Sequence, residues 1–333
     1  MNKARVIAFY LPQFHPIPEN DRWWMKGFTE WTNVGKARPL FPGHYQPKVP
    51  ADLGYYDLRV PETRKAQADM AKEYGIEGFC YWHYWFGNGK RLLERPFNEV
   101  LSSDEPDFPF CLAWANESWR GFYHGIKSKD TLINQLYPGE QDYIAHFHEV
   151  LPAFKDHRYI TVDEKPLFMV YHPLDHPEMK EFIELWRTLA VQNGLKGVYF
   201  IGQTYHLKEE KERLMKMGFD AINVVRLFDF EKKAALTYKY AKWKHKIFRI
   251  PKVVEYKKAS SFFVGDEEYE ENIIPTIIPY MKEAIKRIEN KPLDHRLAFV
   301  KSWNEWAEGN YLEPDLHYGK RYLEVIKKNV VEG

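Results

Sequence analysis

The sequence Val300-Lys301-Ser302-Trp303-Asn304-Glu305-Trp306-Ala307-Glu308-Gly309-Asn310-Tyr311-Leu312-Glu313-Pro314 decides the fold and the site that we expect. An apolar run, Leu297–Val300, leads into it and has the composition of a β-strand. Glu305 and Glu308 follow, three residues apart, and residues at this spacing face opposite sides of an extended strand. Their carboxylates can converge only if the chain turns, so we expect both at the C-terminal end of the strand.

Glu305 and Glu308 are the candidate catalytic residues. Cleavage of a glycosidic bond needs one carboxyl group to donate a proton and another to remove a proton or attack. The alternative is a solvated acidic turn at the end of a strand. Two tryptophans, an asparagine and a glycine in the same segment favour the catalytic interpretation, because polar groups at the ends of barrel strands are usually functional.

Strand-like runs alternate with amphipathic helical segments along the chain. The strand-like runs are Arg5–Tyr10, Gly78–Tyr84, Phe110–Ala115, Leu167–Tyr171, Val198–Gly202, Ala221–Val225, Ile273–Ile278 and Leu297–Val300. The helical segments include Glu62–Tyr74, Gln141–Phe154, Pro177–Gln192, Lys208–Met217, Tyr280–Ile288 and Gly319–Val330. This alternation predicts a parallel sheet, and eight such units predict a closed (β/α)8 TIM barrel. The competing fold is an open doubly wound sheet, but the Gly-rich first turn typical of it is absent.

The domain organisation that we expect is simple. Without repeats, low-complexity stretches or linkers, residues 1–333 are predicted to form a single (β/α)8 catalytic domain. Two connections, 12–61 and 226–272, are long, and the first is rich in aromatic residues. A long aromatic loop after the first strand predicts part of a binding site rather than a spacer.

The composition is ordinary for a soluble globular protein and narrows the possible partners. The net charge is +1, so we expect no nucleic-acid partner. Aromatic residues make up 17% of the chain, which suits sugar binding but also an aromatic core. Cys80 and Cys111 lie in apolar runs and are expected to be buried and reduced. With no signal peptide and no apolar run of membrane-spanning length, we expect a cytoplasmic protein.

Aromatic and hydrogen-bonding residues follow nearly every predicted strand. In a barrel these side chains would surround the mouth, and sugar hydroxyls need many polar partners at once. The predicted substrate-binding residues are Tyr10, Gln13, Trp31, Trp82, His83, Trp114, Asn116, Glu117, Tyr171, Gln203 and Asn304. The aromatic-walled cleft beside the two glutamates is expected to contain Trp82, His83, Trp114, Asn116 and Glu117.

Several of these residues also have a purely structural interpretation. His83 could be a hydrogen-bonded core histidine, and Trp82 and Trp114 could pack between sheet and helices. Glu117 is harder to explain in this way, because a buried carboxylate must be paired or functional. No metal-ligand spacing accompanies His83 and no nucleotide-binding motif is present, so we expect neither a metal nor a cofactor.

The segment 232–258 is strongly basic, with nine lysines and one arginine against a single glutamate, Glu255. Tyr238, Tyr240, Trp243 and Phe248 alternate with these charges. A basic aromatic helix can lie on an anionic membrane or bind an acidic glycan. The alternative is a solvated outer helix of the barrel.

These motifs resemble the WbsX-like proteins, which are described as glycosyltransferases or lipopolysaccharide-biosynthesis proteins and are related to glycoside hydrolase family 99. The resemblance covers almost the whole chain. It rests on Ala8–His15, Gly27–Val34, Gly78–Trp85, Leu112–Trp119 and Trp303–Pro314.

The resemblance implies a (β/α)8 barrel with its active site at the C-terminal face. It also implies that Glu305 removes the proton from the 2-hydroxyl of an α-mannoside, so that this oxygen attacks C1 and forms a 1,2-anhydro sugar. Glu308 would protonate the leaving oxygen and then activate water, while Glu117, Trp114, His83, Tyr10 and Gln203 would shape the pocket. The family's W-D-N-x-x-R-type loop after the seventh strand is not found in 273–288, which predicts a more open cleft.

Three functions remain open on the sequence alone. We favour a retaining glycosidase or transglycosylase, since a carboxylate pair needs neither metal nor nucleotide. A glycosyltransferase of O-antigen or surface-polysaccharide assembly is the alternative, although the Asp-x-Asp pattern of metal-dependent transferases is absent. A non-catalytic glycan-binding barrel is the third. For catalysis we expect Glu308 to carry the raised pKa of an acid and Glu305 to stay ionised.

Overall fold

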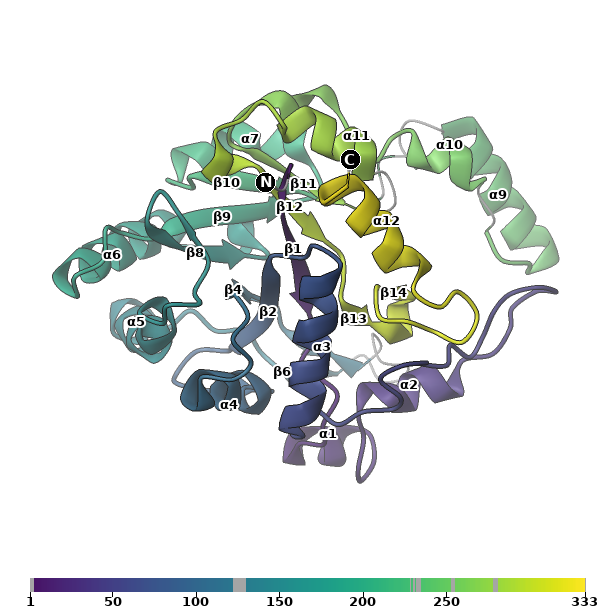
Figure 1. The fold of residues 1–333 in the computed structure, drawn as a ribbon, viewed down its shortest axis with the longest axis horizontal. Helices are drawn as coiled ribbons and strands as arrows, with labels where there is room; N and C mark the ends of the chain where they lie inside the picture. Colours follow the sequence, from purple (N-terminus) through teal and green to yellow (C-terminus); the bar gives the residue numbers. More distant parts are fainter. Residues whose placement is uncertain are drawn as a thin grey trace.

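A computed structural model describes residues 3–121, 130–227, 229, 231, 235–252, 255–277 and 281–332. Within them, eight parallel strands close into a barrel (Figure 1). They are β1 (Arg5–Tyr10), β2 (Gly78–Trp85), β4 (Phe110–Trp114), β8 (Lys165–Val170), β9 (Tyr199–Thr204), β10 (Ala221–Val224), β11 (Ile273–Ile277) and β12 (Leu297–Val300). The barrel closes because β1 pairs in parallel with both β2 and β12.

The predicted (β/α)8 fold is confirmed, and all eight strands lie where the sequence places them. The helices are α1 (Pro18–Trp23), α2 (Glu30–Lys36), α3 (Pro61–Glu73), α4 (Arg95–Ser103), α5 (Glu140–Phe154), α6 (Met179–Gln192), α7 (Leu207–Lys216), α9 (Ala235–Phe248), α10 (Tyr256–Ser260), α11 (Met281–Ile288) and α12 (Arg321–Val330). The predicted loss of a loop after the seventh strand falls on 278–280, outside the described residues. None of the described helices combines the length and apolar composition needed to cross a membrane.

Apolar side chains fill both faces of the strands, as expected for a sheet covered by helices. Inside the barrel, the ring of Phe9 stacks on Trp82 at 4.7 Å and on Phe299 at 5.3 Å between centroids. Outside it, Phe168 of β8 packs against Trp186 of α6 at 4.8 Å. Each fully buried aromatic side chain of this kind contributes about 1.5–3 kcal/mol.

Short elements at the C-terminal end of the barrel shape its mouth. The small strands are β3 (Arg91–Leu92), β5 (Trp119–Arg120), β6 (Thr131–Ile133), β13 (Asn304–Glu305) and β14 (Asn310–Tyr311), and β7 (Thr161–Val162) pairs with β8. After β12, the backbone N–H of Trp303 donates to Phe9 at 2.8 Å, which fixes the exit of the chain. β13 and β14 then form an antiparallel pair around a 3-10 turn, Trp306–Glu308. Gly309 ends this turn at φ +73°, a conformation that favours glycine.

Candidate active site

A cavity of about 820 Å³ opens at the C-terminal mouth of the barrel. Strand β2 and the segments after β1, β4, β8 and β12 supply its walls. The lining includes four carboxylates and two lysines: Glu30, Glu117, Glu305, Glu308, Lys36 and Lys301. Aromatic rings complete the wall: Trp82, Tyr84, Trp119 and Tyr171.

Glu305 lies on the inner wall of this cavity, and its side chain is held at one oxygen only. The indole N–H of Trp82 donates to Oε1 at 3.0 Å, and the backbone N–H of Glu305 donates to the hydroxyl of Ser302 at 3.0 Å. Its other oxygen, Oε2, is buried without a hydrogen-bond partner among the described residues. A buried acceptor without a donor is costly in a native protein, so Oε2 is placed to accept from a ligand.

Lys301 lies between the two glutamates. Its ammonium nitrogen is 3.8 Å from Glu305 Oε2 and 3.7 Å from Glu308 Oε2, which are ion-pair distances too long for hydrogen bonds. Burial acts to lower the pKa of Lys301, but Glu305 and Glu308 outweigh it and the pKa is raised. The lysine is therefore a fixed positive charge shared by both carboxylates.

The two glutamates differ in exposure. Glu308 is 61% exposed and receives a hydrogen bond from the amide of Asn310 at 3.3 Å. Glu305 is only 6% exposed, and this burial raises its pKa, against the opposing effect of Lys301 and with a contribution from Glu308. We expected Glu305 to stay ionised, but its burial raises its pKa, whereas the turn after β13 carries Glu308 out to the rim.

Glu30 is a site residue that the list of predicted site residues missed. It begins α2, is buried and lines the same cavity. Burial raises the pKa of Glu30 to about 7; a hydrogen bond with Asn33 opposes the rise, and the charges of Glu308 and Glu305 add to it. The long aromatic loop after the first strand was a signal for this region, but nothing local in Glu30-Trp31-Thr32-Asn33 shows which side chain faces the cavity.

Four of the predicted substrate-binding residues line the cavity: Gln13, Trp82, Glu117 and Tyr171. Glu117 lies 3.6 Å from the imidazole of His172, another residue of the wall. The hydroxyl of Tyr171 is 3.3 Å from that of Tyr205, and its ring meets Trp82 edge to face at 5.4 Å. Gln13 keeps its amide nitrogen buried without a hydrogen-bond partner in the described part of the chain.

His83 and Trp114 lie outside the cavity, contrary to the cleft that we expected. His83 Nε2 is 2.8 Å from Nε2 of His146 on α5, and burial lowers the pKa of both imidazoles. Trp114 donates its indole N–H to the carbonyl of Trp85 at 2.9 Å and packs against Phe182 of α6. Side chains alternate along a strand, so these two point into the helix layer while Trp82 points into the barrel.

Tyr10, Trp31 and Asn304 also serve the structure rather than the cavity wall. Tyr10 donates its hydroxyl proton to Gln67 of α3 at 2.6 Å, and Trp31 donates its indole N–H to the carbonyl of Tyr56 at 2.7 Å. Asn304 bonds both backbone groups of Leu11, at 2.8 and 3.0 Å, and so ties β13 to the end of β1. These contacts hold the mouth together.

Asn116 and Gln203 complete the predicted set. Asn116 fastens the loop after β8, because its side chain bonds the backbone N–H of His172 at 2.7 Å and the carbonyl of the same residue at 2.8 Å. It lines a smaller neighbouring cavity of about 360 Å³ that shares Glu117 and His172 with the main one. Gln203 is buried on β9 and does not line the main cavity.

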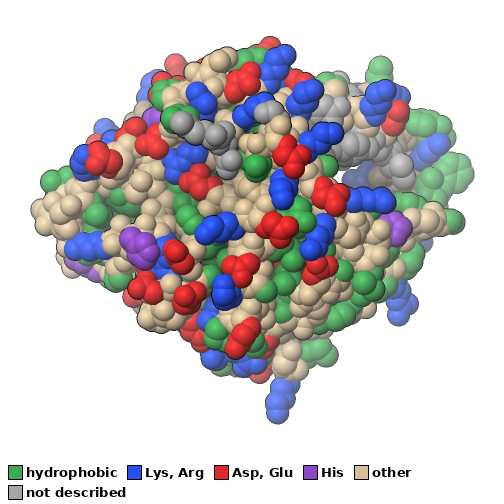
Figure 2. Space-filling view, in the orientation of Figure 1, with side chains coloured by type: hydrophobic (Ala, Val, Ile, Leu, Met, Phe, Trp, Pro, Cys, Tyr) green, Lys and Arg blue, Asp and Glu red, His purple; other side chains and the backbone are tan. Residues whose placement is uncertain are grey.

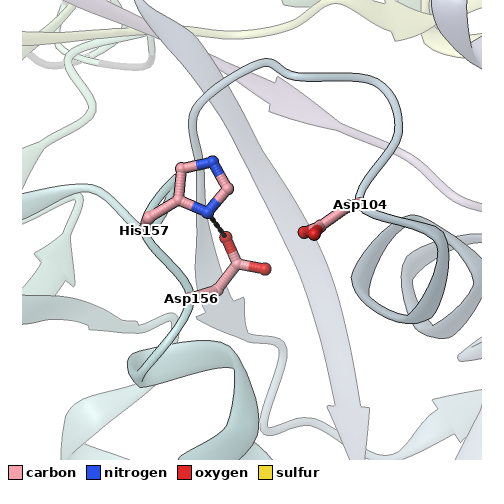
Figure 3. A group of neighbouring side chains, drawn as sticks. All are labelled: Asp104, Asp156 and His157. Atoms are coloured by element: carbon pink, nitrogen blue, oxygen red, sulfur yellow. Dashed lines mark ion pairs between the residues drawn. The ribbon is translucent and has the colours of Figure 1, made fainter.

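Among the described residues, Asp104, Asp156 and His157 lie close enough together to be a candidate metal site (Figure 3). It follows α4 and α5, at the end of the barrel where strands begin. Arg158 lies 2.7 Å from Asp156 and 3.5 Å from Asp104, and so neutralises much of their charge. This group lies at the other end of the barrel from the cavity, and the ion pairs with Arg158 account for its two aspartates.

The chain is a (β/α)8 barrel whose mouth holds a carboxylate pair among aromatic side chains, and its sequence matches one described protein family. The match to the family described as Glycosyltransferase WbsX covers residues 6–280 and 278–326. The chain therefore belongs to the WbsX glycosyltransferase family, which confirms the resemblance of its motifs.

The chain is also similar in sequence to two curated proteins. The chain is 36% identical over 359 residues to the uncharacterized protein WxcX of Xanthomonas campestris pv. campestris (strain ATCC 33913), and 35% identical over 362 residues to WxcX of strain B100. These alignments cover 98% of this chain and 49% of each relative. The chain thus spans about half the length of the curated relatives it matches.

Solved structures show the same fold. The GH99 endo-α-mannosidase from Bacteroides thetaiotaomicron superposes with a TM-score of 0.56 at 16% identity, covering 97% of this chain and 95% of that one. A glycoside hydrolase-like protein gives a TM-score of 0.56 at 14% identity, covering 98% and 93%. At these sequence identities the similarity shows that the folds are the same and does not show a shared activity.

Proposed function

We propose that this protein cleaves a glycosidic bond of an oligosaccharide or polysaccharide with retention at C1, using Glu305 as base and Glu308 as acid. The observation that carries the proposal is the carboxylate pair bridged by Lys301 on the wall of the 820 Å³ cavity. This pair can handle two protons at once, as glycoside cleavage requires.

The proposed first step runs through the sugar's own 2-hydroxyl. Glu305 takes the hydroxyl proton, the oxygen forms a bond to C1, and the bond from C1 to the leaving oxygen breaks as Glu308 gives that oxygen its proton. The product is a 1,2-anhydro sugar. Burial supports the role of Glu305, because a carboxylate with a raised pKa is a stronger base than an exposed one.

The second step restores the enzyme. Glu308, exposed at the rim, takes a proton from water as the water oxygen bonds to C1 and the bond from C1 to the 2-oxygen of the anhydro sugar breaks. The freed 2-oxygen regains its proton from Glu305. Two displacements at C1 return the original configuration, and the exposure of Glu308 suits a group that must meet solvent.

A glycosyl transfer to a sugar hydroxyl instead of water is the second candidate. The family description favours it, and it needs the same two glutamates with an acceptor hydroxyl in place of water. A third interpretation, a non-catalytic glycan-binding barrel, gives no role to the carboxylate pair bridged by Lys301.

The experiment compares Glu305→Gln and Glu308→Gln with the wild type on α-mannosides that carry good or poor leaving groups. Glu305→Gln should abolish turnover of both, whereas Glu308→Gln should spare the activated substrate in part, since a good leaving group needs little protonation. Glu212→Gln, an exposed carboxyl on α7, is the matched control. Normal cleavage of a 2-deoxy substrate would rule out the neighbouring-hydroxyl route, and full activity of both variants would rule out the glutamate assignment.

A further inference from the structure

Helix α9 carries an apolar stripe that nothing in the described chain covers. Leu236 is 84% exposed, Tyr240 56%, Trp243 51% and Ile247 53%. At about 100° per residue, these four side chains fall within an arc of roughly 60° on the helix surface. A contiguous apolar surface of this kind marks a contact with another surface rather than with water.

The stripe points away from the barrel. The buried side chains of α9, Tyr238 and Ala241, lie on the opposite face of the helix from the stripe. Figure 1 shows α9 and α10 at the right-hand edge of the molecule, with α9 standing clear of the barrel strands. Figure 2, in the same orientation, shows hydrophobic and basic side chains gathered at that edge.

Lysines flank the stripe on both sides. Lys239, Lys242 and Lys246 follow one flank and Lys244 the other, and 235–248 contains no Asp or Glu. The ammonium of Lys244 lies 4.6 Å from the ring centre of Tyr240, and Tyr240 stacks with Trp243 at 5.9 Å. Charge and aromatic rings therefore form one continuous surface.

The charge pattern discriminates between possible occupants. A second copy of this face would bring lysines against lysines across a two-fold contact, which is repulsive. An anionic lipid bilayer is complementary to both features of α9: its phosphates attract the lysines, and the boundary of its acyl chains accommodates the apolar stripe. Trp and Tyr prefer this interfacial depth.

We propose that α9 docks this protein on the surface of an anionic lipid bilayer, lying in the plane of the interface with its stripe at the head-group boundary. This inference goes beyond the proposed glycoside chemistry and does not depend on it. It replaces the interpretation of 232–258 as a solvated outer helix, since the described part of that segment turns its apolar face outward.

The test is co-sedimentation of the whole chain with vesicles of phosphatidylglycerol and phosphatidylcholine, against vesicles of phosphatidylcholine alone. Binding should require the anionic lipid and weaken with added salt. Trp243→Ser with Ile247→Ser removes the stripe, and Lys239→Gln with Lys242→Gln and Lys246→Gln removes one flank of charge. Each set should weaken binding about tenfold or more, because a surface lysine and a buried apolar side chain each contribute substantially.

The controls keep the proposal falsifiable. Val191→Ser removes another exposed apolar side chain, on α6, a helix that Figure 1 shows at the opposite edge of the molecule from α9, and should bind as the wild type does. Thermal unfolding of every variant shows that the barrel is intact. Equal binding to neutral and anionic vesicles, or stripe variants that bind as the wild type does, would overturn the proposal. If the wild type forms a dimer in lipid-free buffer and the stripe variants do not, this face binds a second copy of the chain instead of a bilayer.

Discussion

At the residue scale, the cavity depends on how its charges are shared. Glu305 is buried with one oxygen that accepts no hydrogen bond, Glu308 reaches the rim, and Lys301 forms an ion pair with each of them. A carboxylate without an opposite charge nearby gains a proton more easily. Burial raises the pKa of Glu305, and the positive charge of Lys301 opposes that rise.

Lys301→Met should move the acidic limb of the pH–rate profile to higher pH. Loss of the ammonium removes the effect that holds the pKa of Glu305 down, so the base ionises about one pH unit or more later. The measurement is kcat/KM against pH. Lys36→Met removes a different lysine of the same cavity and should leave the limb in place; an equal shift in both variants would contradict the bridging role.

Glu30→Gln should make the protein more stable above pH 7. A carboxyl with a pKa of about 7 when folded and 4.5 when unfolded binds more protons in the folded state, so the free energy of unfolding falls as pH rises between these values. Above pH 7 the full cost is roughly 3 kcal/mol. The amide removes that cost, and chemical denaturation at pH 5 and pH 8 measures the difference. If the difference in the free energy of unfolding between the wild type and the variant is the same at pH 5 and at pH 8, the charge of Glu30 is not buried as the structure places it.

At the element scale, alternation along each strand decides which tryptophans meet a ligand. Trp82 on β2 and Trp114 on β4 follow similar apolar runs, but Trp82 donates to Glu305 and Trp114 donates to the carbonyl of Trp85. The first faces the barrel interior and the second the helices. Residue type alone does not separate them.

The pair Trp82→Phe and Trp114→Phe tests this difference with one substitution on two faces. Trp82→Phe should lower kcat, because Glu305 loses its donor and its orientation. Trp114→Phe should leave kcat and KM unchanged and lower the free energy of unfolding by about 1–3 kcal/mol, since a buried carbonyl loses its partner. Steady-state kinetics and denaturant unfolding of both variants provide the measurement. A loss of kcat in Trp114→Phe but not in Trp82→Phe would show that Trp114, and not Trp82, faces the site of catalysis.

At the scale of the whole molecule, Glu313 joins segments that are far apart in the sequence. Its carboxylate accepts hydrogen bonds from Tyr56 at 2.9 Å, Gln67 at 2.7 Å and Trp306 at 2.6 Å. Burial raises its pKa to about 7, although these donors oppose the rise. The segment after β12 is thereby tied to α3 and to the long loop after β1, and the segment and the loop both line the cavity.

Glu313→Ala should lower the free energy of unfolding by about 3 kcal/mol or more, because three buried donors lose their acceptor. Glu313→Gln keeps the shape and one acceptor oxygen and should cost less. Denaturant unfolding of both variants at pH 8 measures the loss. An alanine variant as stable as the glutamine variant would show that the three donors find other partners.

The barrel and the position of the glutamate pair could be predicted because their signals are local. Apolar runs of strand length, alternating with helical segments, specify where each strand begins and ends whatever its neighbours are. The end of the last strand then places Glu305 and Glu308 at the mouth. The motifs in the same order along the chain predicted the family, and the match to it agrees.

Only the tertiary structure decided which side chains enter the cavity. Whether Trp114 or Trp82 faces inward depends on the register of each strand in the closed barrel, and a shift of one residue reverses it. The burial of Glu305, the exposure of Glu308 and the entry of Glu30 from α2 depend on contacts between segments nearly 300 residues apart, such as Asn304 with Leu11. Burial sets the pKa of a carboxyl through the protein packed around it, so this part of the site had no local signal in the sequence.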